Sequence, residues 1–172
     1  MAEDPGDSGY LIAITGIPSV GKSTVSGEVR RHSSTFRLFD GDQFIRNTPG
    51  SLQPTNALKT LSLMLDEVER WLMSSNVILD VTLPASFVER TRERFGSSVM
   101  FVSLRVEEDE WHRRDSHRTD RGRLRQWDAS LTALQGPEDL YDLVIDTTHL
   151  TPHGCAERIL SKAQDFWESV RL

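Results

Sequence analysis

The eight residues from Gly16 to Ser23, GIPSVGKS, constrain the fold of this chain more than any other feature. They match the pattern GxxxxGK[ST] at every fixed position, they follow the apolar run YLIAIT, and a helical stretch begins at about Lys22. Glycines in such a loop let backbone N–H groups turn inward around phosphate oxygens, and the helix N-terminus adds partial positive charge. The sequence therefore predicts a strand, a phosphate-binding loop and a helix, in that order.

The polar residues of this loop have specific chemical roles. Lys22 is expected to reach the β- and γ-phosphates of a nucleotide, and the Ser23 hydroxyl can bind Mg²⁺. The pattern predicts a site for ATP and Mg²⁺, against the alternative of a chance Gly/Ser turn before a helix. The candidate nucleotide contacts in the loop are Gly16, Ser19, Val20, Gly21, Lys22, Ser23 and Thr24.

Short apolar runs alternate with helical stretches along the whole chain. This alternation predicts an α/β fold in three layers, a five-stranded parallel sheet with helices on both faces. We expect residues 1–9 to form a disordered tail and residues 10–172 to form a single domain. The strands are predicted at 10–15, 37–39, 77–81, 99–106 and 143–145, and the helices at 22–31, 58–72, 86–95, 107–118 and 152–170.

One aspartate ends a predicted central strand. Asp80 closes the run VILD, and ligands of open α/β sheets bind at the carboxyl ends of the strands. A carboxylate there orients Mg²⁺, often through water, or contacts the acceptor. The alternative is an aspartate that terminates the strand or caps the following turn.

Two further aspartates follow the second predicted strand. A kinase that phosphorylates a hydroxyl benefits from a carboxylate that accepts the hydroxyl proton. Asp42 is the better candidate than Asp40, because Phe44 and Ile45 follow it as a possible apolar wall. The competing interpretation is an Asp-Gly turn in which Asp42 caps a helix.

Positive charge is concentrated in one segment of an otherwise acidic chain. The net charge is −6, yet the segment 113–125 holds six arginines against two aspartates. Arg114, Arg118 and Arg121 follow the spacing of one helical face, and planar guanidinium groups stabilise transferring phosphoryl groups well. We expect a mobile lid at about 113–126 that closes over ATP, against the alternative of a solvated helix with internal ion pairs.

The composition excludes several functions. An acidic chain is a poor general nucleic-acid binder, because such proteins need basic surfaces. No apolar run approaches the ~20 residues of a membrane span, so we expect no membrane partner. Cys155 is the only cysteine, which makes the reducing cytoplasm the expected location.

Three segments together resemble the chloramphenicol phosphotransferase family of small P-loop kinases: LIAITGIPSVGKST with the following DGDQFI, then RRDSHRTDR, then YDLVIDTTHLTPHGCAERIL. The resemblance implies a P-loop kinase fold with an arginine-rich lid and an ATP-dependent transfer to a hydroxyl of a small molecule. It implies that Asp42 is the catalytic base, that Arg118 and Arg121 hold the phosphates, and that Arg114 lies against the adenine. The loop with Thr148 is then expected beside the nucleotide base.

The acceptor stays open at this point. The leading hypothesis is a hydroxyl of an antibiotic-like compound or a metabolite; the alternatives are a nucleotide, adenylylsulfate, a sugar acid or a nucleotide-sugar, and a nucleotide-dependent switch module. The acceptor surface is expected within residues 43–60, 81–90 and 121–136, with Trp127 as a candidate contact. His149 and His153 have no third ligand at metal-site spacing, so we expect surface or capping roles for both.

Overall fold

The structure, a computed structural model, describes residues 9–51, 54–117 and 136–170. Its five strands form one parallel sheet in the order β2-β3-β1-β4-β5, which confirms the predicted α/β fold. The strands are β1 (Leu11–Thr15), β2 (Phe36–Asp40), β3 (Asn76–Asp80), β4 (Val99–Arg105) and β5 (Leu143–Asp146). The α-helices are α1 (Lys22–His32), α2 (Gly41–Asn47), α3 (Ala57–Leu72), α4 (Ala85–Phe95), α5 (Glu108–Ser116) and α7 (Pro152–Val170).

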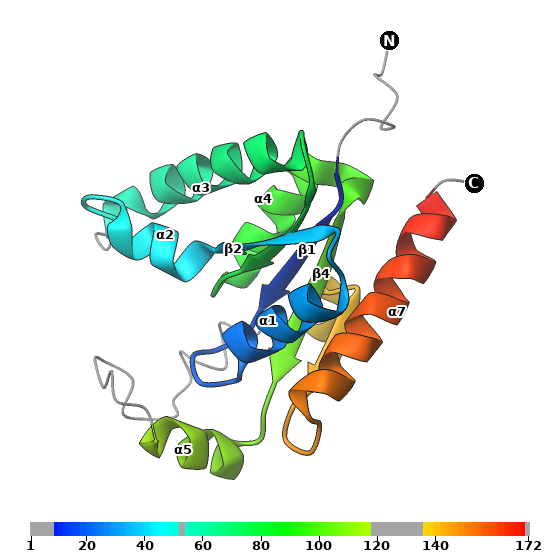
Figure 1. Cartoon of the computed structure of the whole chain (residues 1–172). Coiled ribbons are helices and arrows are strands. Elements are labelled where there is room, and N and C mark those ends of the chain that lie inside the picture. Colours follow the sequence, from blue (N-terminus) through cyan, green and yellow to red (C-terminus); the bar gives the residue numbers. More distant parts are fainter. Residues whose placement is uncertain (1–8, 52–53, 118–135, 171–172) are drawn as a thin grey trace.

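Helices cover both faces of the sheet, α1 and α7 on one face and α3 and α4 on the other (Figure 1). Side chains of β1 alternate between the two hydrophobic clusters that fill these layers. Ile12 and Ile14 pack in the cluster of α1 and α7, whereas Leu11 and Ala13 pack in the cluster of α3 and α4. A strand buried on both faces has to be apolar at every position, which explains the unbroken run of the sequence.

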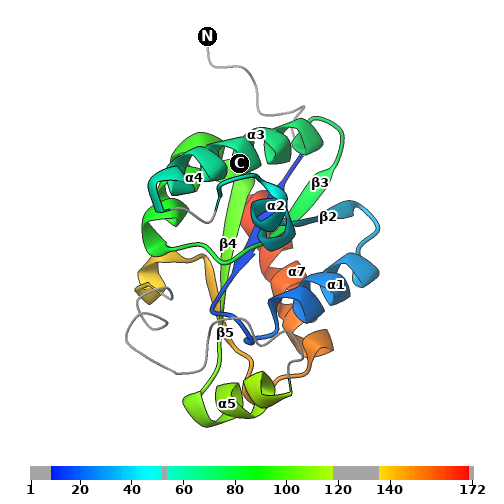
Figure 2. The ribbon, with the colours of Figure 1, turned by 90° about the vertical axis from the view of Figure 1, so that its left-hand side faces the viewer.

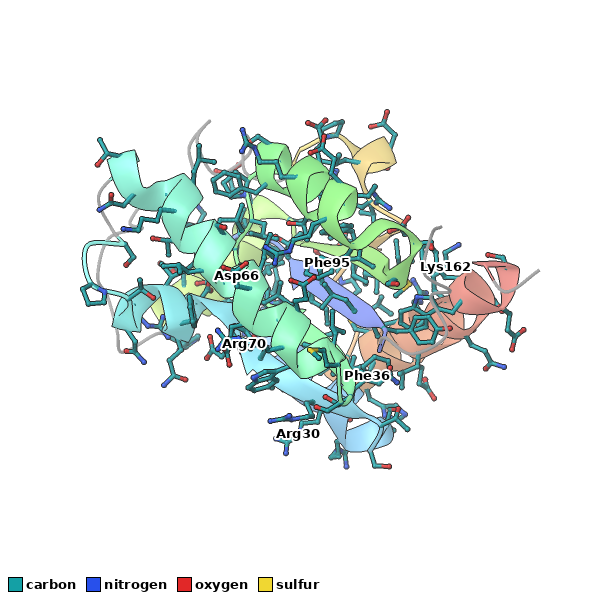
Figure 3. All side chains as sticks on the ribbon, turned by 90° about the horizontal axis from the view of Figure 1, so that it is seen from above. Arg30, Phe36, Asp66, Arg70, Phe95 and Lys162 are labelled. Atoms are coloured by element: carbon teal, nitrogen blue, oxygen red, sulfur yellow. The ribbon has the colours of Figure 1, made fainter. Side chains whose placement is uncertain are left out.

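An ion pair joins the two helices of the α3 and α4 layer. Arg94 of α4 donates to Asp66 of α3 at 2.7 Å, and Asp66 is labelled in Figure 3. Both side chains lie near the surface, so the pair contributes only a few tenths of a kcal/mol up to about 1 kcal/mol.

The strand order places β1 between β3 and β4, so the loop after β1 opens at the middle of the sheet. All strands are parallel, and their carboxyl ends therefore meet at one edge. Helix α5 lies beyond this edge, close to the turn that joins β1 to α1 (Figure 2). This arrangement brings the loop after β1, the ends of β2 and β3 and the start of α5 into one region.

Helix α2 is absent from the predicted helices, and only the alternative interpretation, a turn in which Asp42 caps a helix, allowed for one at this place. Asp40 caps the helix, its side chain accepting a hydrogen bond from the Gln43 N–H at 2.7 Å. At Gly41 a Cβ atom would lie 2.7 Å from the Cβ of Val81 in the strand-end loop. Only glycine therefore lets α2 start this close to the loop that follows β3.

Within the described residues, the structure holds no helix with the length and apolar character of a membrane span.

Candidate active site at the carboxyl edge of the sheet

The loop between β1 and α1 has the conformation of a phosphate-binding loop. Gly21, immediately before α1, has φ 103°, a left-handed value that favours glycine, and Ser19 has φ 66°. The Lys22 side chain is 7% exposed and folds back over the loop, donating to the Gly16 carbonyl at 3.1 Å and approaching that of Ile17 at 3.5 Å. The predicted phosphate-binding lysine is therefore held against the loop itself.

Asp80 is the buried carboxylate of this edge, 3% exposed at the end of β3. Burial raises its pKa from 3.8 to about 6, an effect opposed by a hydrogen bond from the Ser23 hydroxyl and by the nearby Lys22 charge. The neighbouring carboxylates of Asp42 and Asp40 raise the pKa further. Among the described residues, Asp80 Oδ1 has no hydrogen-bond partner.

This donor set fits Mg²⁺. A buried carboxylate oxygen without a partner and a serine hydroxyl beside it are hard oxygen ligands of the kind that Mg²⁺ takes from P-loop proteins. The Ser23 hydroxyl therefore lies near the Asp80 carboxylate, as the prediction of a shared Mg²⁺ site requires.

Asp42 lies in the first turn of α2 and points toward the phosphate loop. Its Oδ1 accepts a hydrogen bond from the Thr82 N–H at 3.0 Å, and its Oδ2 lies 3.4 Å from the Thr82 hydroxyl. The same Oδ2 is 3.9 Å from the Lys22 Nζ. Asp40, not Asp42, is the helix cap, so the interpretation in which Asp42 caps a helix is wrong, and Asp42 is the one that lies beside Lys22.

Helix α5 is attached to the phosphate loop by three polar contacts. The Trp111 Nε1–H donates to the Pro18 carbonyl at 2.7 Å, and the Ser19 hydroxyl donates to Asp115 at 2.7 Å. Arg114 Nη1 donates to the Val20 carbonyl at 2.9 Å. The first part of the predicted lid is thereby fixed to the backbone that would cradle phosphates.

Arg114 also joins this loop to the residues after β5. Its Nη1 donates to the Thr147 hydroxyl at 2.8 Å and its Nη2 to the Thr147 carbonyl at 2.7 Å. Glu110 accepts from Arg113 and Arg114, which lowers its pKa to about 2. The ion pairs expected as the alternative are therefore present for both arginines, and Arg114 in addition bridges the loop and the residues after β5.

Thr148 and Thr147 have different contacts. The Thr148 hydroxyl accepts from the Glu107 N–H at 2.9 Å, so it supports the start of α5. Thr147, which the sequence reasoning did not select, is buried and its hydroxyl lies within 3.1 Å of the Val20 carbonyl. The loop that contains both thus adjoins the phosphate loop.

Several residues of the site were not singled out by the sequence. Thr82, Trp111, Asp115 and Thr147 contact the loop or Asp42 across long sequence separations, and no local pattern marks them. Three of the predicted residues, Arg118, Arg121 and Trp127, lie outside the described residues.

The parallel sheet with this loop and these acids defines the fold of P-loop kinases. Solved structures of this class have the same fold at low identity. The Mycobacterium tuberculosis APS kinase CysC, in complex with AMPPNP and APS, is 14% identical with a TM-score of 0.72, covering 91% of this chain and 98% of its own. The Deinococcus radiodurans tunicamycin resistance protein is 20% identical with a TM-score of 0.68, covering 90% and 95%. The Acinetobacter baumannii shikimate kinase in complex with shikimate is 17% identical with a TM-score of 0.67, covering 92% and 95%.

The comparison with family models identifies a more specific group than the shared fold does. The family model described as chloramphenicol phosphotransferase-like protein matches residues 68–164, more than half of the chain. The chain belongs to this family, which confirms the predicted resemblance. A comparison with curated proteins found no match.

Proposed function

We propose that this protein is an ATP-dependent, Mg²⁺-requiring kinase that transfers the γ-phosphoryl group to a hydroxyl of a small molecule. The observation that carries the proposal is the position of Asp42 beside the phosphate-loop lysine, with 3.9 Å between its Oδ2 and the Lys22 Nζ. A base and a phosphate-binding cation at this separation can face the two partners of one phosphoryl transfer.

The nucleotide side of the proposed reaction depends on the loop and on α5. The loop N–H groups and Lys22 would bind the β- and γ-phosphates, and Arg114 would present its face to the base side of the nucleotide. Ser23 and Asp80 would hold Mg²⁺, which when bound neutralises phosphate charge. The remaining proposed phosphate contacts are Gly16, Ser19, Val20, Gly21 and Thr24, with Arg118 and Arg121 proposed to stabilise the transferring group.

The acceptor side depends on Asp42. Its carboxylate is oriented by the Thr82 N–H on one oxygen, while the other oxygen faces Lys22. We propose that it accepts the proton of the acceptor hydroxyl as the new O–P bond forms. A side chain fixed in this way needs little reorganisation before it takes the proton.

The basic residues favour an acceptor without its own phosphate. A phosphorylated acceptor, such as a nucleotide, adenylylsulfate or a nucleotide-sugar, needs a second cluster of free cations. In the described part of the chain, most arginines outside α5 already have a partner. Among those described residues, Arg46 of α2 is the arginine near Asp42 in sequence that forms no ion pair with a carboxylate. The partnered arginines are Arg31 with Glu28, Arg37 with Trp71, Arg70 with Glu67, Arg92 with Asp142, Arg94 with Asp66 and Arg105 with Glu138. We therefore propose a hydroxylated acceptor without a phosphate group, either an antibiotic or a metabolite.

The test is ADP release, measured by a coupled assay with and without a panel of hydroxylated antibiotics, sugars and shikimate-like acids. One acceptor is expected to raise ADP release well above the rate of hydrolysis by water. Asp42→Asn is expected to lower kcat by about 100-fold or more, the size of a general-base contribution, with ATP affinity nearly unchanged. Asp40→Asn is the matched control, because asparagine caps a helix as well as aspartate does.

Two results would contradict the proposal. If no acceptor raises ADP release, the nucleotide-dependent switch is the better interpretation. If Asp42→Asn weakens ATP binding as much as it lowers turnover, Asp42 supports the structure rather than the proton transfer.

A further inference from the structure

Two histidines and a glutamate meet on the outer side of the α1 and α7 layer. One nitrogen of His32, one nitrogen of His153 and a carboxylate oxygen of Glu28 all lie within 4.8 Å of one another. The two imidazole rings are 4.7 Å apart between centroids. We propose that these three side chains form a site for a divalent transition metal, with Zn²⁺ as the ion that its chemistry suits.

The ligand types and one measured separation fit a zinc site. Zinc takes imidazole nitrogen and carboxylate oxygen at about 2.0–2.2 Å, which places neighbouring ligands of a tetrahedron about 3.3–3.5 Å apart. His153 Nδ1 and Glu28 Oε1 are 3.5 Å apart. These two atoms could therefore share an ion with little movement of either helix.

His32 approaches the shared carboxylate through Nδ1, which lies 3.6 Å from Glu28 Oε1. The same Nδ1 lies 2.9 Å from the main-chain carbonyl oxygen of Glu28. A carbonyl oxygen only accepts, so Nδ1 carries a proton in this contact and has to lose it before it binds an ion. Metal binding through this nitrogen is therefore expected to release a proton.

His153 has support from a carboxylate. Its Nε2 lies 3.4 Å from Glu157 Oε1, while its Nδ1 faces Glu28. Metal-binding histidines generally donate their second ring nitrogen to an acceptor of this type. His153 thus has an outer partner, Glu157, in addition to the shared glutamate.

Arg31 is the natural competitor of the metal for Glu28. It pairs with both carboxylate oxygens and holds the pKa of Glu28 below its ordinary value, so the carboxylate is ionised. The Arg31 side chain is 68% exposed, and it can turn into solvent when a dication takes its place. Removal of Arg31 is therefore expected to strengthen metal binding.

The experiment measures Zn²⁺ affinity of the full chain without nucleotide, by competition with a chromogenic chelator, and the visible spectrum of the Co²⁺ form. We expect one ion per chain and a Co²⁺ spectrum of low coordination number. His32→Gln and His153→Gln are each expected to weaken binding by at least about 10-fold, the loss that even a supporting group causes. His149→Gln is the matched control, since His149 is exposed and precedes the same helix, and it should leave affinity unchanged.

Arg31→Ala tests the same site in the opposite direction, because it frees Glu28 and removes a positive charge. It should tighten Zn²⁺ binding by several-fold while the melting temperature in a chelator stays close to that of the parent. The proposal is overturned if both histidine variants bind Zn²⁺ like the parent, if Arg31→Ala weakens binding, or if Zn²⁺ raises the molar mass in solution by bridging two copies.

Discussion

Asp80 gives the most quantitative prediction, because its burial has a measurable effect on stability. Its folded-state pKa is about 6, against an ordinary value of 3.8. The folded protein therefore binds the proton more tightly than the unfolded chain, and stability falls as the pH rises from about 4 to about 6. At 1.36 kcal/mol per pKa unit, the interval from 3.8 to about 6 corresponds to a loss of about 3 kcal/mol at pH 8.

Asp80→Asn removes this charge while keeping the shape of the side chain. At pH 5 the same relation lowers the free energy of unfolding of the parent by about 1.6 kcal/mol relative to low pH. The difference in free energy of unfolding between variant and parent should therefore change by about 1.4 kcal/mol between pH 5 and pH 8. Any constant cost of burying the amide group cancels in this comparison. The shift should favour the variant at the higher pH.

The assay is urea unfolding of parent and variant at pH 5, 6.5 and 8 in a metal chelator. The reasoning is refuted if the difference in free energy of unfolding between variant and parent is the same at all three pH values. It is also refuted if the variant becomes less stable relative to the parent as the pH rises. Asp40→Asn is again the comparison variant, because it changes an exposed carboxylate at the end of the neighbouring strand. Addition of MgCl₂ with ATP should stabilise the parent more than the Asp80 variant.

Two further perturbations test the packing of the site. Arg114→Gln removes the hydrogen bonds to Val20 and Thr147. ATP should then bind at least about 10-fold more weakly in calorimetry, the effect of one to two charge-assisted hydrogen bonds. An unchanged affinity would mean that the nucleotide binds elsewhere. Gly41→Ala forces a Cβ atom to 2.7 Å from Val81, so the free energy of unfolding should fall by about 1–3 kcal/mol in chemical denaturation. Gly27 has open space around it, so Gly27→Ala is the control and should not lower stability.

Most of the fold was predictable because its signals are local. The apolar run of β1, the loop GIPSVGKS and the buried strand that ends at Asp80 are each readable within about ten residues, and the structure places all three as predicted. Helix α2 was not predictable, since the DGD sequence that starts it is equally typical of a turn. Whether this segment forms a turn or a helix depends on the close approach of Gly41 to Val81, a contact across 40 positions of the chain.

The site was only partly predictable for the same reason. Lys22, Ser23 and Asp80 follow strand ends or a motif, whereas Asp115 reaches Ser19 from 96 positions away. The proposed metal site is a stronger example, since Glu28 and His32 of α1 come within 4.8 Å of His153 only when α1 packs against α7. Polar side chains that pair across a long sequence separation produce no periodic pattern in the sequence.

Asp40 and Asp80 show why residue type alone could not assign these roles. The two aspartates are register partners at the ends of neighbouring strands β2 and β3. Asp40 is exposed and its carboxylate accepts from a helix N–H, so it stabilises the fold where it lies. Asp80 is buried, and burial raises its pKa, so its ionised form is expected to lower the stability of the metal-free protein. Folding alone would favour a neutral side chain at this position. A carboxylate placed there, next to the lysine of the loop, is what the proposed Mg²⁺ site would require.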